Sequence, residues 1–87
     1  FKDAYNAIAE FNKIKEIYET RLRLEQASKS TLDLAQLQYL NGVIGYMDLL
    51  DAQRGYLDAQ IGLSNAVRDK QISMVNLYKA LGGGWQE

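Results

Sequence analysis

The chain has 87 residues, a formal net charge of -1, and no proline, cysteine or histidine. Disulfides, thiolate or histidine zinc sites, and Ser-His or Cys-His nucleophiles are therefore excluded. A composition of 47% hydrophobic and 24% charged residues is typical of one folded domain, and the balanced charge gives no sign of a nucleic-acid surface. No apolar run approaches the roughly 20 residues of a membrane span. Because the chain begins at Phe1 and not at Met, we expect it to be a segment of a longer protein.

The first half of the chain, about residues 2–40, is predicted to form one helix. Its apolar residues recur at helical spacing, at Ala4, Ile8, Phe11, Tyr18, Leu22, Leu32 and Tyr39. Charged pairs four residues apart favour a solvated opposite face: Lys15–Glu19, Glu19–Arg23, Arg21–Glu25 and Glu25–Lys29. The segment Ser28–Asp33 resembles a helix cap, but no glycine or proline stops the pattern, so continuity is preferred.

The second half, about residues 46–81, carries a clearer pattern. Steps of three and four residues give a stripe of alternating large and small side chains: Leu49, Ala52, Tyr56, Ala59, Leu63, Ala66, Lys70, Ser73, Leu77 and Ala80. Small residues at heptad spacing let two helix backbones approach closely, and Lys70 can bury its stem while its ammonium stays in water. This stripe is interpreted as a helix–helix seam.

The fold class that follows is all-α: a long antiparallel two-helix hairpin of coiled-coil type, with a turn at residues 41–45. Each helix would be about 55 Å long at about 1.5 Å per residue. Eight aromatic residues exceed what one seam can bury: Phe1, Tyr5, Phe11, Tyr18, Tyr39, Tyr46, Tyr56 and Tyr78. We expect the surplus to pack against other copies or other parts of the parent protein, and the isolated chain to self-associate.

The residues between the two predicted helices carry the signals that end the first helix and begin the second. Asn41 and Gly42 both tolerate the left-handed backbone conformation that ends a helix. Gly45 is expected to be the N-cap of the second helix, which places Asp48 at its N3 position, where a carboxylate is favourable. Asp51 lies one turn further along and is predicted to pair with Arg54 or to be solvated.

Paired carboxylates also occur in acid–base catalysis, but a hairpin tip supplies neither a pocket to shift a pKa nor partner groups. A di-iron bundle site needs histidines that the chain lacks. The sequence therefore predicts no enzyme, no metal site and no cofactor.

The stretch "YLNGVIGYMDLLDAQRGYLDAQ", from Tyr39 onward, resembles the tip of the second helical hairpin in TolC-like outer membrane efflux proteins. The ending "NLYKALGGGW", residues 76–85, is similar to the C-terminal end of that hairpin in the lipoprotein branch that partners multidrug efflux pumps. The resemblance spans essentially the whole chain and is most specific at residues 39–53 and 76–85.

This resemblance implies a homotrimer in a Gram-negative outer membrane, with this segment part of a trimeric α-helical tunnel in the periplasm. The tunnel would export drugs or other small molecules together with a periplasmic adaptor protein and an inner-membrane pump. Aspartates matching Asp48 and Asp51 narrow the tunnel in some members, and are expected to form a gate facing the lumen. Such a ring of carboxylates concentrates cations and repels anions.

The resemblance also places the adaptor-docking tip at the turn, at Tyr39, Asn41, Gly42, Val43 and Ile44. Val43 and Ile44 are two apolar residues expected to be exposed to solvent in an isolated hairpin, which favours a contact surface over a simple turn. Packing against a neighbouring turn of the same trimer is an equal alternative. A tyrosine matching Tyr39 belongs in some members to a latch with an arginine. This chain departs from that pattern, with Ile44 at the arginine position.

One alternative stays open from the sequence: an interaction module, such as the helical hairpin of a periplasmic adaptor or a coiled-coil spacer. The sequences "DLLDAQ" and "YKALGGGW" favour the channel protein.

Overall fold

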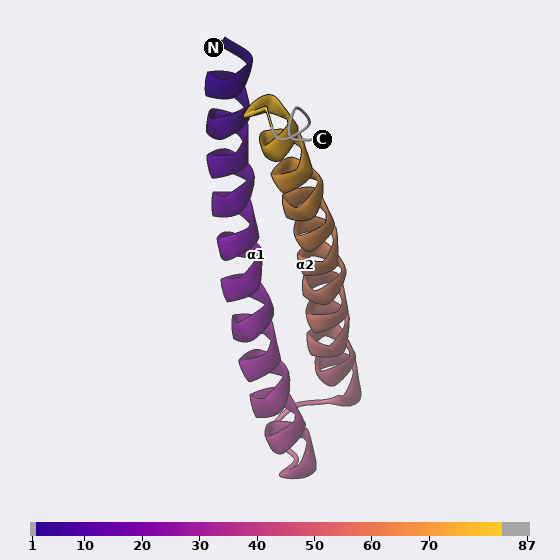
Figure 1. The fold of residues 1–87 in the computed structure, drawn as a ribbon. Coiled ribbons are helices and arrows are strands. Elements are labelled where there is room, and N and C mark those ends of the chain that lie inside the picture. Colours follow the sequence, from indigo (N-terminus) through magenta and orange to yellow (C-terminus); the bar gives the residue numbers. More distant parts are fainter. Residues whose placement is uncertain (1, 83–87) are drawn as a thin grey trace.

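The computed structural model describes residues 2–82 as two long helices, α1 (Lys2–Leu40) and α2 (Tyr46–Ala80), joined by a short turn (Figure 1). The helices run antiparallel, so the start of α1 and the end of α2 lie at one end of a rod measuring 63 × 21 × 14 Å. The described residues contain no strand. The predicted all-α hairpin is therefore confirmed. Within residues 2–82, neither helix combines the length and the hydropathy needed to cross a membrane.

The seam predicted for α2 is confirmed along its full length. None of its ten positions is exposed. Leu49, Ala59, Ala66 and Ser73 are buried, and the other six positions are half-buried. The small side chains are the most deeply buried, with Ala59 only 4% exposed, because α1 approaches closely there.

The face that α1 presents to α2 differs in part from the predicted one. Ile8 and Tyr39 were expected on that face, but they are 43% and 39% exposed. The inward positions that the predicted pattern missed include Ala7, Ile14, Glu25, Ser28 and Ala35. All of these except Ile14 are small or polar, because the inward face continues in heptads through such residues and a selection of large apolar residues leaves them out.

The predicted ladder of charged pairs on α1 is not formed. Between residues 2 and 82, the ion pairs are Lys29–Asp33 and Arg68–Asp69, each with an N···O distance of 3.7 Å. Lys29–Asp33 lies inside the segment that resembled a helix cap, and α1 is continuous through it. Glu25 belonged to two of the expected pairs, but it forms a hydrogen bond across the seam with Tyr56.

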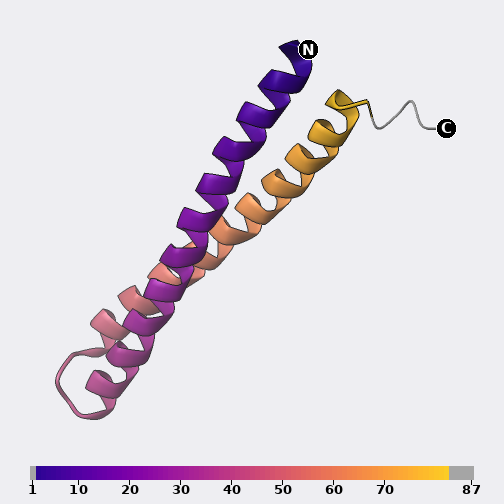
Figure 2. The ribbon, with the colours of Figure 1, turned by 60° about the vertical axis from the view of Figure 1, so that its left-hand side comes forward.

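Large apolar side chains remain exposed on both helices, as expected for a hairpin with a single seam. Figure 2 shows no third layer over either helix. The exposed side chains include Tyr5 (72%), Leu40 (80%) and Tyr78 (57%). Two residues named above for their aromatic surface or their motif, Phe1 and Trp85, lie outside the described residues.

Candidate functional site

The turn at residues 41–45 ends α1 with a glycine in a left-handed conformation. Gly42 has φ = 74°, which a side chain would strain. Its N–H donates to the carbonyl of Tyr39 at 3.1 Å, and the N–H of Val43 donates to the carbonyl of Gln38 at 2.8 Å. These two bonds form a Schellman motif, which satisfies carbonyls at the end of the helix. The chain therefore reverses sharply here, and Gly42 is the residue that permits it.

Asn41 contributes its side chain and not a left-handed backbone, because no residue other than glycine has positive φ in the described part of the chain. Its Nδ2 donates to the carbonyl of Leu37 at 2.8 Å. At the start of α2, Gly45 is the N-cap, with φ = -85° and ψ = 172°. The Gly45 N–H donates to Oδ2 of Asp48 at 3.4 Å. Since glycine has no side chain to return a bond, this is the carboxylate half of a capping box.

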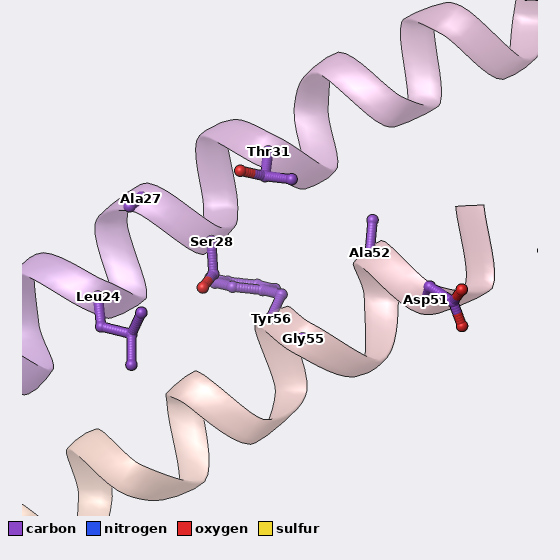
Figure 3. A pocket seen from close by; sticks show the side chains of 8 residues that line it. All are labelled: Leu24, Ala27, Ser28, Thr31, Asp51, Ala52, Gly55 and Tyr56. Atoms are coloured by element: carbon purple, nitrogen blue, oxygen red, sulfur yellow. The ribbon is translucent and has the colours of Figure 1, made fainter. Parts of the chain in front are cut away.

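Asp51 lies at the edge of a shallow hollow between the two helices. The hollow has a volume of about 290 Å³ and is lined by Leu24, Ala27, Ser28, Thr31, Asp51, Ala52, Gly55 and Tyr56. Figure 3 shows the Tyr56 ring extending from α2 toward α1 beside Ser28, while the Asp51 carboxylate points away from that ring. Both Asp48 and Asp51 are exposed, one turn apart, on the first two turns of α2. The Asp51 carboxylate forms no ion pair with Arg54 in the described structure. Of the two environments expected for this carboxylate, pairing with Arg54 or exposure to solvent, the structure shows exposure to solvent.

The apolar residues of the turn are exposed to different extents. Val43 is 67% exposed, whereas Ile44 is half-buried, so the expectation that both side chains are exposed to solvent is wrong for Ile44. Tyr39 packs against Tyr46 across the turn, with ring centroids 5.9 Å apart and planes tilted by 54°. This tilted geometry is favourable for aromatic pairs. Tyr46 was not predicted as a partner of Tyr39. The signal available was the nearness of two tyrosines on either side of a five-residue turn.

Sequence reasoning also missed two contacts in the middle of the seam. The hydroxyl of Tyr56 donates to Oε2 of Glu25 at 3.0 Å. Lys70 Nζ lies 4.4 Å from the centroid of the Tyr18 ring, a cation–π distance. Glu25 follows Tyr18 by one heptad, so continuing the α1 pattern in heptads would have placed it in the seam.

The chemistry available at the tip is that of charge, shape and apolar contact. Within the described residues, no group of three or more acidic, histidine or cysteine side chains is placed to hold a metal ion. Two exposed carboxylates stand just beyond a tight turn that presents an apolar side chain, Val43.

The sequence model of the outer membrane efflux protein family matches residues 1–83. The probable outer membrane lipoprotein SilC of Salmonella typhimurium is 31% identical over all 87 residues, which cover 19% of that protein. The outer membrane protein OprJ of Pseudomonas aeruginosa is 32% identical over 87 residues, or 18% of its length. The probable efflux pump outer membrane protein TtgC of Pseudomonas putida is 36% identical over 87 residues, again 18% of its length.

The chain thus spans about a fifth of the length of these relatives. No solved structure matches it significantly. The family match covers nearly the whole chain, and the relatives align with all of it. The chain belongs to the outer membrane efflux protein family.

Proposed function

We propose that this chain is the periplasmic tunnel hairpin of an outer membrane channel that exports drugs or other small molecules in a tripartite efflux pump. The observation that carries the proposal is a family match over residues 1–83 on a rod-like hairpin with a tight turn at its end. The relatives named above are outer membrane proteins, which favours the channel over an adaptor hairpin or a spacer. For the same reason the role is transport and not catalysis.

The exposed apolar surface supports assembly into a larger tube. Tyr5, Leu40 and Tyr78 each have more than half of their surface in contact with solvent. Burying such side chains contributes about 25 cal/mol per Å² of apolar area removed from water. In the proposed homotrimer, helices of the parent protein and of its copies cover these faces. The isolated chain self-associates to cover them.

Asp48 and Asp51 are proposed as the gate. Both carboxylates are exposed near the tip and neither is neutralised by an ion pair in the described structure. A threefold axis would gather them into a ring around the lumen. Charges of one sign in a narrow passage raise the local concentration of cations and repel anions.

The turn itself is proposed as the surface that meets the periplasmic adaptor, which links the channel to an inner-membrane pump. It consists of Tyr39, Asn41, Gly42, Val43 and Ile44. Val43 offers an exposed apolar contact, and Gly42 keeps the turn narrow enough to fit between neighbouring turns. Each tip is small, so affinity comes from several tips engaging together.

The gate is tested in the full-length trimer by single-channel recording of the double variant Asp48→Asn/Asp51→Asn. The amide keeps the size of the side chain and removes its charge, so cation selectivity and block by multivalent cations should weaken while the trimer assembles normally. The matched control is Glu10→Gln, because Glu10 is an exposed carboxylate on α1 near the end of the rod opposite the turn. Unchanged selectivity in a correctly assembled double variant would remove the gate assignment.

A further inference from the structure

Two aromatic rings meet at the base of the turn, one from the end of α1 and one from the start of α2. The ring centroids of Tyr39 and Tyr46 are 5.9 Å apart, with planes tilted by 54°. Tyr39 lies in the last turn of α1, and Tyr46 is the first residue of α2. Tilted aromatic pairs contribute stabilisation beyond the apolar area that they bury. The pair therefore joins the two helix ends directly across the turn.

A second apolar pair is placed to close the inner side of the turn. Gly45 is the N-cap of α2 and Asp48 is its N3 residue. Ile44 therefore occupies the N′ position and Leu49 the N4 position. Apolar residues at these two positions form a hydrophobic staple, which fixes the direction from which the chain enters the helix. Burial agrees with this assignment, since Ile44 is half-buried although it lies in a turn, and Leu49 is only 8% exposed.

The aromatic pair and the staple lie next to each other. A small hollow at the end of α1 is lined by Gln36, Tyr39, Leu40 and Leu49, so Tyr39 of the first pair and Leu49 of the second share one depression. We call four residues the turn brace: Tyr39, Ile44, Tyr46 and Leu49. They come from the last turn of α1, from the connecting segment and from the first turn of α2, so the brace spans the whole turn.

Val43 is an apolar residue of the same turn, but its side chain lies outside the brace and is 67% exposed. Its backbone is held on both sides. The N–H of Val43 donates to the carbonyl of Gln38 at 2.8 Å, which ties it to α1. The next residue, Ile44, belongs to the brace and leads into α2. The exposed apolar side chain of the turn is therefore carried by a backbone with little freedom.

We propose that the turn brace holds the turn in one conformation before a partner binds, and that its four residues position Val43 for docking. The inference rests on the proposed docking of the turn to the periplasmic adaptor. It divides that surface into a contact residue, Val43, and the residues that support it. A surface already fixed in its bound conformation loses less conformational entropy on binding, so the same contact area gives a higher affinity. This gain matters most for a small tip.

The test measures the order of the turn and its docking in the same full-length trimer. Hydrogen exchange followed by mass spectrometry reports on the backbone amides of residues 41–44, among them the N–H groups of Gly42 and Val43 that donate to α1. Affinity for the purified periplasmic adaptor is measured by surface plasmon resonance. Tyr46→Ala removes the aromatic pair and Ile44→Ala removes the staple. The two variants act on separate contacts, so either one suffices if the other does not assemble.

Tyr46→Ala should raise the exchange rate of these amides about fivefold, the factor that loss of one aromatic pair implies. It should also weaken adaptor binding, by up to the same factor, because only tips in the docking conformation bind. Ile44→Ala should change both readouts in the same directions. The conservative variants Tyr46→Phe and Ile44→Val keep the ring and the branched apolar side chain, and should restore both readouts. Met47→Ala is the matched control for exchange, since Met47 is a 65% exposed neighbour of Tyr46 outside the brace.

Three results would overturn the proposal. Unchanged exchange in both alanine variants would mean that the Schellman motif and the helix cap order the turn without the brace. Weaker adaptor binding with unchanged exchange would make Tyr46 or Ile44 a direct contact of the adaptor. Faster exchange with unchanged binding would mean that order in the turn does not serve docking. Failure of the proposed docking is recognised separately, by normal adaptor binding in Val43→Asp, and the exchange rates then still decide whether the brace orders the turn.

Discussion

The hydroxyl of Tyr56 on α2 and the carboxylate of Glu25 on α1 are joined by a 3.0 Å hydrogen bond across the seam. This bond holds the pKa of Tyr56 above its ordinary value, since an ionised phenol could not donate it. Partial burial and the negative charges of Glu25 and Asp33 raise the pKa in the same direction. The neutral phenol is therefore the form that the folded hairpin stabilises.

The first prediction is a loss of stability in alkali. Because the pKa of Tyr56 is higher in the folded chain than its value of about 10 when unfolded, its contribution is fully present below about pH 10 and is lost as pH rises through the folded pKa. Tyr56→Phe should remove this part of the pH dependence in denaturation experiments. Tyr5→Phe, at a tyrosine 72% exposed, is the matched control and should leave the dependence unchanged. Equal pH profiles for wild type and Tyr56→Phe would contradict the role of the hydrogen bond.

The second prediction compares two glycines within α2. A Cβ at Gly55 would meet nothing within 4 Å, so Gly55→Ala should raise the free energy of unfolding by about 1 kcal/mol through helix propensity. A Cβ at Gly62 would lie 3.2 Å from Arg21, which must shift, so Gly62→Ala should gain less. Urea titrations followed by circular dichroism measure both changes. An equal or larger gain at Gly62 would show that Arg21 does not pack over α2 there.

The third prediction separates capping from gating at the start of α2. Asp48 accepts from the N–H of Gly45 and lies in the first turn, where a carboxylate interacts favourably with the helix dipole. Asp48→Ala should therefore lower stability by about 0.5 kcal/mol. Asp51→Ala should have almost no effect, because Asp51 accepts no hydrogen bond from the helix start within the described structure. The unfolding temperatures of the two variants are compared by thermal denaturation. Equal shifts of the two unfolding temperatures would refute the capping role of Asp48.

Much of the fold could be predicted because its signals are local. The alternation of large and small residues in α2 indicates its seam, and Gly42 and Gly45 mark the turn through their residue type and spacing alone. The inward face of α1 was harder to predict, since Glu25 and Ser28 occupy it and neither is apolar. Whether a glutamate faces a seam or solvent depends on the partner across the gap, and that partner lies 31 positions away in the chain.

The tip was predictable as a turn, but the exposure of its side chains was not. Sequence places Val43 and Ile44 next to each other with the same chemistry, yet one is 67% exposed and the other is half-buried. The backbone at Val43 is held by the Schellman motif through its bond to the carbonyl of Gln38, which forms only once the chain has turned back on the end of α1. The contact of Tyr39 with Tyr46 also depends on the path of the backbone through the turn, which brings the two rings together, and not on either residue alone.

The central claim, that this turn is the docking end of an efflux channel, is tested at Val43. Gly42→Trp is a less specific probe, since φ = 74° means that any side chain there strains the turn itself. Val43→Asp instead adds a charge to an exposed side chain and leaves the backbone free to keep its path. Gln60→Asp is the matched control, because it adds the same charge at an exposed position of α2 far from the turn.

The most direct measurement is in-cell crosslinking of the periplasmic adaptor to the full-length channel, with drug susceptibility recorded in the same strains. Val43→Asp should abolish both the crosslink and the resistance at normal outer-membrane levels of the channel, while Gln60→Asp should leave both intact. If the crosslink and the resistance both persist with Val43→Asp, the turn is not the docking surface.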